Sequence, residues 1–341
     1  MNKTPEIRLT GLDLIRSCAI LFVIAGHFSL NTGFQQAIFE GPSMFIQGTM
    51  KFFFGMGVPL FLLLTGYLNS KKELSSRYYR GGLRVAASYL LFSIITVLFR
   101  KYALGTEYSW LEWGHKILSF SAIPYGWYIE MWIGLFLLTP FLNILYRHIP
   151  NQKQKLVLLG TLFLITALPD WTNRYGLHLV PEFWVNCFPL FFYFAGAYIR
   201  EYQPSISKIW GGGGGGVAIF GFCLLAPLFN TFFVKNHSMI QIAGDPSGIF
   251  GSVISILFFL IYYTWNTNCL PAKKMLAGIS KASLDMYLCC YIFDALLYPT
   301  FRDLWKWNGP AQAGWYFPVI VPTLFLCSFT TAWLKEKILK F

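Results

Sequence analysis

The sequence predicts an all-α protein: a polytopic membrane helical bundle of about ten transmembrane helices, with both termini in the cytoplasm. Hydrophobic residues make up 55% of the 341 residues and charged residues only 12%, whereas soluble domains carry about 25% charged residues. Apolar segments long enough to cross a bilayer recur along the chain between polar turns. Lys and Arg cluster in alternate loops, which is typical of a multi-pass topology.

Hydropathy and helix-breaking residues divide the whole chain, 1–341, into spans that form one transmembrane domain. The expected spans are 9–30, 45–68, 84–104, 126–146, 155–169, 182–200, 210–228, 247–265, 283–300 and 315–334.

The distribution of basic residues orients these spans. Eighteen Lys and Arg residues fall on the side of the bundle that holds both termini, and eight fall on the opposite side. Positive charge is enriched in cytoplasmic loops, so both termini are expected in the cytoplasm. The net charge of +12 is therefore explained by topology, and we expect no nucleic-acid partner.

The first span is unusual because Asp13, Arg16 and His27 interrupt the apolar sequence of residues 9–28. At about 100° and 1.5 Å per residue, Arg16 and His27 lie within about 20° of one helix face and about 16 Å apart. Polar groups in hydrocarbon are costly, which indicates a functional site in a protein interior or wet cavity. The alternatives are a snorkelling anchor for Arg16 and a structural role for His27.

A basic segment, residues 69–84, precedes the third span and contains Arg77, Arg80 and Arg84. If the segment is helical, Arg80 and Arg84 share a face and Arg77 lies one turn before Arg80. Guanidinium groups bind phosphate in a bidentate manner, so this row suits a polyphosphate ligand. The alternative is topology together with contact to anionic lipids.

The run LDLIRSCAILFVIAGH at the first span resembles the first-helix signature of the integral-membrane acyltransferase 3 family. That signature has an Arg, ten further residues and a His, with an Asp three residues before the Arg; here these are Asp13, Arg16 and His27. The family also places a pair of Arg residues before the third span. The spacing leaves two choices for that pair, Arg77 with Arg80 or Arg80 with Arg84.

Two later stretches extend the resemblance. Residues 127–140 are similar to the family's run from a Trp to a Pro thirteen positions on. Many members have a Glu five residues after that Trp; here this position is Trp132, and Glu130 is our candidate instead, although an aromatic belt also explains this stretch. Residues 283–291 resemble a family motif of Ser, Tyr and His, but Cys290 takes the place of the His, which argues against a direct role there.

The resemblance implies a bacterial inner-membrane O-acyltransferase that moves an acyl group from cytoplasmic acyl-CoA, most simply acetyl-CoA, to a hydroxyl of a cell-surface or undecaprenyl-linked glycan. His27 would be the general base, or the nucleophile of an acyl-histidine intermediate. Arg16 with Asp13 would position the donor, Glu130 would assist near the outer leaflet, and Arg77, Arg80 and Arg84 would bind the donor's phosphates. Succinyl transfer stays open.

Other function classes are less well supported by the sequence. A lipid-linked glycan flippase or transporter would use a similar basic and aromatic cavity, but clear inverted repeats are not seen. For a non-enzymatic scaffold, three polar residues on one membrane helix would be costly. Walker, HExxH and GxSxG motifs are absent, the seven Cys residues have no metal-ligand spacing, and we expect no metal. We also expect no extracytoplasmic hydrolase-like domain, which some family members carry.

Overall fold

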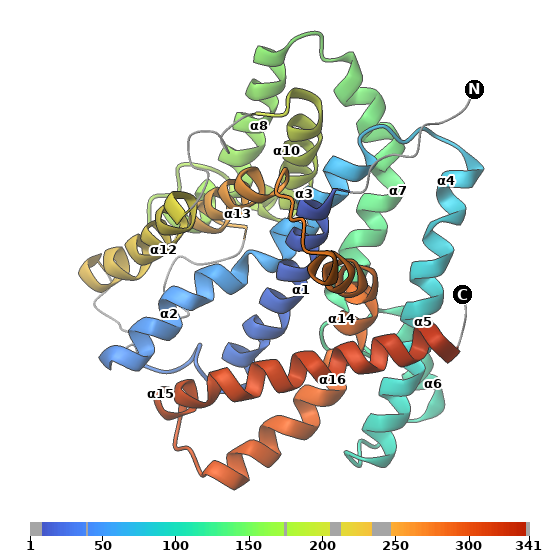
Figure 1. The fold of residues 1–341 in the computed structure, drawn as a ribbon, viewed down its shortest axis with the longest axis vertical. Coiled ribbons are helices and arrows are strands. Elements are labelled where there is room, and N and C mark those ends of the chain that lie inside the picture. Colours follow the sequence, from blue (N-terminus) through green and yellow to red (C-terminus); the bar gives the residue numbers. More distant parts are fainter. Residues whose placement is uncertain (1–8, 39, 174–175, 205–212, 234–246, 339–341) are drawn as a thin grey trace.

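The computed structural model describes residues 9–38, 40–173, 176–204, 213–233 and 247–338, and the regular structure in these ranges is helical (Figure 1). The elements are α1 (Thr10–Asn31), α2 (Gly41–Gly55), α3 (Gly57–Asn69), α4 (Ser76–Arg80), α5 (Gly82–Tyr102), α6 (Trp110–Leu118), α7 (Trp127–His148), α8 (Gln152–Thr166), α9 (Leu168–Thr172), η2 (Glu182–Cys187), α10 (Phe188–Tyr202), α12 (Gly213–Phe233), α13 (Ile249–Tyr262), α14 (Leu270–Trp305), α15 (Pro310–Ala313), η4 (Gly314–Tyr316) and α16 (Phe317–Ile338).

Seven helical segments in the described ranges are long and apolar enough to cross a membrane. They are Thr10–Asn31, Gly41–Asn69, Ser76–Tyr102, Trp127–His148, Gln152–Thr172, Leu270–Trp305 and Pro310–Ile338.

The structure thus confirms an all-helical protein with multiple membrane-length helices, but it does not confirm a count of ten. The spans expected at 182–200 and 247–265 fall on α10 and α13, which have 15 and 14 residues. At 1.5 Å per residue these helices extend only about 22 Å, less than the roughly 30 Å hydrocarbon core. The span expected at 210–228 falls on α12, and its residues 210–212 lie outside the described ranges.

The helix α1 lies in the interior of the bundle, in contact with α3 on one side and α14 on another (Figure 1). Ile15, Ala19, Ile20 and Ile24 of α1 are completely buried. The Ser17 hydroxyl bonds to the carbonyl of Leu276 at 3.2 Å, which joins α1 to α14. The helix with the Asp, Arg and His stripe is therefore surrounded by protein, as the cost of polar groups in lipid requires.

Close contact between α3 and α10 depends on a glycine of each helix. A Cβ added to Gly66 would lie 1.9 Å from the carbonyl oxygen of Tyr193, and one added to Gly196 would lie 2.1 Å from that of Leu63. Only a residue without a side chain lets the two backbones approach this closely. These contacts hold α3 beside α10.

The helix α14 begins at Leu270, thirteen residues before the span expected at 283–300. Hydropathy missed this part because Lys273, Lys274 and Lys281 lower the apolar average, although helical geometry continues through it. The extra turns carry Lys281, which pairs with Glu336 of α16.

Candidate active site

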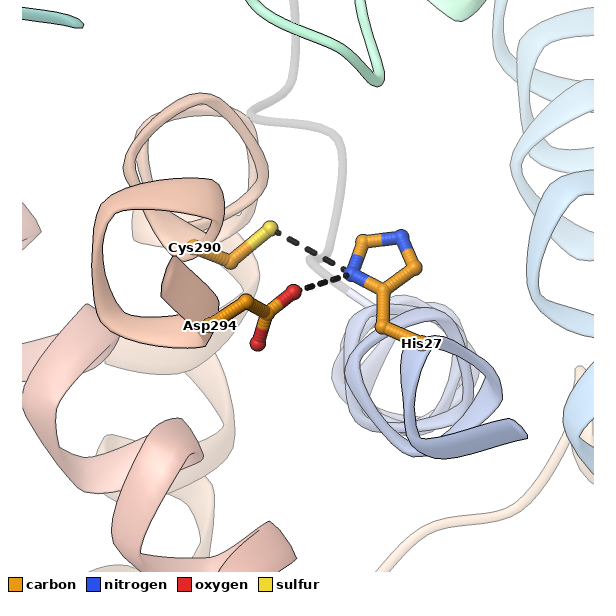
Figure 2. Close-up of side chains that lie close together, drawn as sticks. All are labelled: His27, Cys290 and Asp294. Atoms are coloured by element: carbon orange, nitrogen blue, oxygen red, sulfur yellow. Dashed lines mark hydrogen bonds and ion pairs between the residues drawn. The ribbon is translucent and has the colours of Figure 1, made fainter. Parts of the chain in front are cut away.

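His27 of α1 faces an acidic partner on α14. Its Nδ1 lies 3.3 Å from Oδ2 of Asp294, and the side chains of His27 and Asp294 are only 10% and 1% exposed (Figure 2). A carboxylate that accepts a hydrogen bond from Nδ1 fixes the imidazole tautomer and orientation. In Figure 2 the other ring nitrogen, Nε2, points away from Asp294 and Cys290. Neither of these two residues therefore engages Nε2.

Tyr125, in the turn before α7, supports both members of this pair. Its ring stacks on the His27 imidazole with centroids 3.8 Å apart, and its hydroxyl donates to Oδ2 of Asp294 at 2.9 Å. Burial and the neighbouring Asp294 carboxylate raise the pKa of the Tyr125 hydroxyl, so this group stays a donor. Asn31 donates from its side-chain amide to the Tyr125 hydroxyl at 3.3 Å and to the His27 carbonyl at 2.9 Å.

Cys290 completes the immediate surroundings of His27. Its Sγ lies 3.6 Å from Nδ1 of His27 and donates to the carbonyl of Tyr287 at 3.1 Å. It is completely buried. The resemblance argued against a direct role at this position, yet the structure places the sulfur against the candidate base.

The donor atoms of His27, Cys290 and Asp294 all lie within 4.8 Å of one another, so the three residues form a possible metal-ligand set. Sγ of Cys290 lies 3.1 Å from the carbonyl oxygen of Tyr287, and Oδ2 of Asp294 accepts from Tyr125. Oδ1 of Asp294 is buried without a hydrogen-bond partner in the described part of the chain. The cluster is therefore a His27–Asp294 pair with the Cys290 sulfur beside it.

Arg16 lines a second feature, a cavity of about 330 Å³ between α1, α3, α5, α7 and α14, which we call the Arg16 cavity. Val23, on the same helix face and one turn before His27, also lines it. The rings of Tyr128 and Tyr287 meet edge to face in its wall, 5.4 Å apart. The Tyr287 hydroxyl donates to the backbone carbonyl of Tyr125, so the cavity wall directly adjoins the His27 cluster.

A further cavity of about 420 Å³ adjoins the Arg16 cavity, because Lys281 and Leu284 line both. We call it the Arg84 cavity, since Arg84 of α5 lines it. Arg77 and Arg80 are exposed and do not line it. The structure therefore separates Arg84 from the two other basic residues of the predicted row.

The two remaining candidates lie apart from His27. Asp13 is buried in the first turn of α1, where a carboxylate interacts favourably with the helix dipole. Glu130 is exposed, because Tyr128 and Ile129 form the inner face of the first turn of α7 and Glu130 projects on the opposite side. Among the described contacts, the structure brings Asp294, Tyr125 and Cys290 to His27, and it does not bring Glu130 there.

Sequence reasoning missed Asp294 and Tyr125. For Asp294 a signal existed, since a carboxylate within the apolar span 283–300 is a functional candidate by default. Tyr125 gave no signal of this kind because it precedes an aromatic-rich helix whose composition fits a membrane-interface belt.

Comparison with known proteins identifies the family of the chain. Residues 9–334 match the family model Acyl_transf_3, described as an acyltransferase domain. Comparison with curated proteins and with solved structures gives no significant match. The family match covers nearly the whole chain, including α1, the Arg16 cavity and the His27 cluster. The chain therefore belongs to the acyltransferase 3 family of membrane acyltransferases.

Proposed function

We propose that this protein is a bacterial inner-membrane O-acyltransferase that moves an acyl group, acetyl in the simplest case, from cytoplasmic acyl-CoA to a hydroxyl of a cell-surface or lipid-linked glycan. The observation that carries the proposal is the His27–Asp294 pair, held at 3.3 Å and linked through Tyr125 to Tyr287 in the wall of the Arg16 cavity. The family match supports the acyltransferase class. The charge distribution supports a cytoplasmic Arg84 end and an outer His27 end.

The donor would enter from the cytoplasmic side. Its phosphates would lie at the Arg84 cavity, with Arg77 and Arg80 on the adjacent surface as attracting charges. The pantetheine arm would pass through the Arg16 cavity, where the Arg16 guanidinium, oriented by Asp13, offers hydrogen bonds to its amides or to the thioester carbonyl. Tyr128 and Tyr287 would then bound the reacting end.

At the reacting end, Nε2 of His27 would take the proton of the acceptor hydroxyl as its oxygen attacks the thioester carbonyl. The carbon–sulfur bond then breaks, and His27 returns the proton to the coenzyme A thiolate. Asp294 would stabilise the imidazolium that forms between these two transfers. The same nitrogen could instead attack the thioester and carry the acyl group, and trapping of an acylated His27 would identify that route.

The experiment is transfer of radiolabelled acetyl from acetyl-CoA by the purified protein in lipid nanodiscs, with hydrolysis of acetyl-CoA measured in parallel. His27→Ala is expected to abolish transfer while coenzyme A binding by calorimetry stays close to that of the wild type, because a proton-transfer group acts mainly in the transition state. Near wild-type transfer by His27→Ala would overturn the assignment. Mass spectrometry of surface glycans with and without the gene would then identify the acceptor.

A further inference from the structure

The Arg84 cavity carries more positive charge than the basic segment 69–84 supplies. Lys281 of α14 and Lys335 of α16 line it together with Arg84 of α5, so three helices each contribute one cation. Asp285 and Glu336 are the carboxylates in its wall. Three cations face two carboxylates, and the cavity therefore favours an anion.

The ion pairs of the two lysines differ in how firmly they are held. Lys335 donates to both carboxylate oxygens of Asp285 at 2.8 and 2.9 Å and to the Ser88 hydroxyl at 2.7 Å. The side chains of Lys335 and Asp285 are only 14% and 16% exposed. The Lys335 ammonium is held in place, because breaking three short hydrogen bonds at a largely buried position costs free energy.

Lys281, by contrast, pairs with Glu336 at the surface, where the two side chains are 62% and 47% exposed. Exposed ion pairs contribute little to stability and are screened by salt. Arg84 forms no hydrogen bond or ion pair with the described part of the chain, although it lines the same cavity. Lys281 and Arg84 are therefore the two cations that can change partner at low cost.

We propose that Lys281 and Arg84 bind a phosphate group of the acyl-CoA donor, and that Glu336 occupies Lys281 until the donor displaces it. This inference rests on the proposed function, because acyl-CoA is what would bring phosphate to this cavity. A phosphate monoester carries about 1.5 to 2 negative charges and three acceptor oxygens, so it competes well with a single carboxylate. Glu336 thus acts as an internal competitor for the donor site.

The proposal predicts opposite effects for the two members of one ion pair. Coenzyme A would be titrated by calorimetry onto the full-length protein in phosphatidylcholine nanodiscs, at fixed and roughly 0.1 M ionic strength. Lys281→Gln should weaken coenzyme A binding about three- to tenfold. Glu336→Gln should tighten it by up to about fivefold, since that is the factor by which an exposed ion pair can compete. Lys274→Gln, an exposed lysine on the same helix, is the matched control and should leave binding unchanged.

The double variant tests whether the two effects share one site. In the Lys281→Gln background, Glu336→Gln should not increase the affinity for coenzyme A. Glu336 has no lysine to pair with in that background, so its removal frees no cation. Pantetheine, which lacks the nucleotide phosphates, should bind equally to wild type and both variants. If the ion pair is only structural, Glu336→Gln will weaken binding or leave it unchanged, and the proposal is overturned.

Anionic lipid headgroups present the same phosphate chemistry, so a second arm uses nanodiscs that contain phosphatidylglycerol. If Lys281→Gln lowers retention of this lipid but not the affinity for coenzyme A, the site binds headgroups and the proposal fails. Wild-type protein that neither binds coenzyme A nor transfers acetyl would refute the proposed function itself. If the wild type does both, and the Lys281→Gln and Glu336→Gln variants bind coenzyme A with the same affinity as the wild type, only the phosphate site is refuted.

Discussion

Oδ2 of Asp294 lies 3.3 Å from Nδ1 of His27, although the two residues come from helices near opposite ends of the chain. The same oxygen accepts the Tyr125 hydroxyl at 2.9 Å. One carboxylate oxygen thus orients the imidazole and is itself held in place, an arrangement suited to a general base.

Asp294→Asn should lower kcat for acyl transfer by about 10²- to 10⁴-fold, because the amide no longer stabilises the imidazolium or enforces the tautomer. The KM for acyl-CoA should change little, since Asp294 lies away from both cavities. Asp303→Asn, an exposed position near the end of the same helix, is the control. Steady-state kinetics of both variants provide the measurement. Equal kcat values for Asp294→Asn and Asp303→Asn would show that the His27–Asp294 pair does not act in catalysis.

Tyr125→Phe removes the hydroxyl but keeps the ring that stacks on His27. A hydrogen bond to a charged group is worth about 1.5 to 3 kcal/mol, so kcat should fall about 10- to 100-fold. Tyr125→Ala should lower kcat further, because the ring that stacks on His27 is also removed. Tyr102→Phe, at a 73% exposed tyrosine, should retain full activity. Unchanged kcat in Tyr125→Phe would show that Asp294 needs no such support.

Metal removal separates a His–Asp pair from a metal centre built on His27, Cys290 and Asp294. We expect transfer to survive dialysis against a strong chelator and Cys290→Ala to retain most activity, because neither change removes the base or its carboxylate. Elemental analysis of the purified protein provides the independent readout. Activity lost on chelation and restored by zinc would reassign the cluster as a metal site.

Gly66→Ala should destabilise the protein by about 1 to 3 kcal/mol, because its Cβ would lie 1.9 Å from the Tyr193 carbonyl oxygen and α3 must move from α10. Gly134→Ala is the matched control: no heavy atom lies within 4 Å of the added Cβ, and the helical site gains from alanine. Thermal unfolding in detergent should show a lower transition temperature for Gly66→Ala alone. Equal transitions would mean that the close contact between these helices is absent in solution.

The membrane orientation is tested with reporter fusions. Fusions after Arg80 and Lys274 should read as cytoplasmic, and fusions after Lys116 and Arg302 should read as external, because the loops around the first two are rich in Lys and Arg. A cytoplasmic signal at Lys116 would invert the proposed direction of donor entry.

The sequence by itself determined the helical class, the presence of several membrane-length helices and the shared face of Arg16 and His27. These properties follow from composition and from the fixed 3.6-residue period of one helix, so neighbouring residues suffice to predict them. The family resemblance, on the Asp13, Arg16 and His27 motif, was confirmed by the match over residues 9–334.

Only the tertiary structure decided which residues meet His27 and which basic residues line a cavity. Asp294 and Tyr125 reach His27 through the packing of α1 against α14 and the turn before α7, and no local period encodes such contacts. The row of Arg77, Arg80 and Arg84 was divided by the way α5 packs on α14, which leaves Arg84 in a cavity wall and Arg77 and Arg80 outside it. Helical periodicity specifies the direction of a side chain on its own helix, whereas its partners depend on long-range packing.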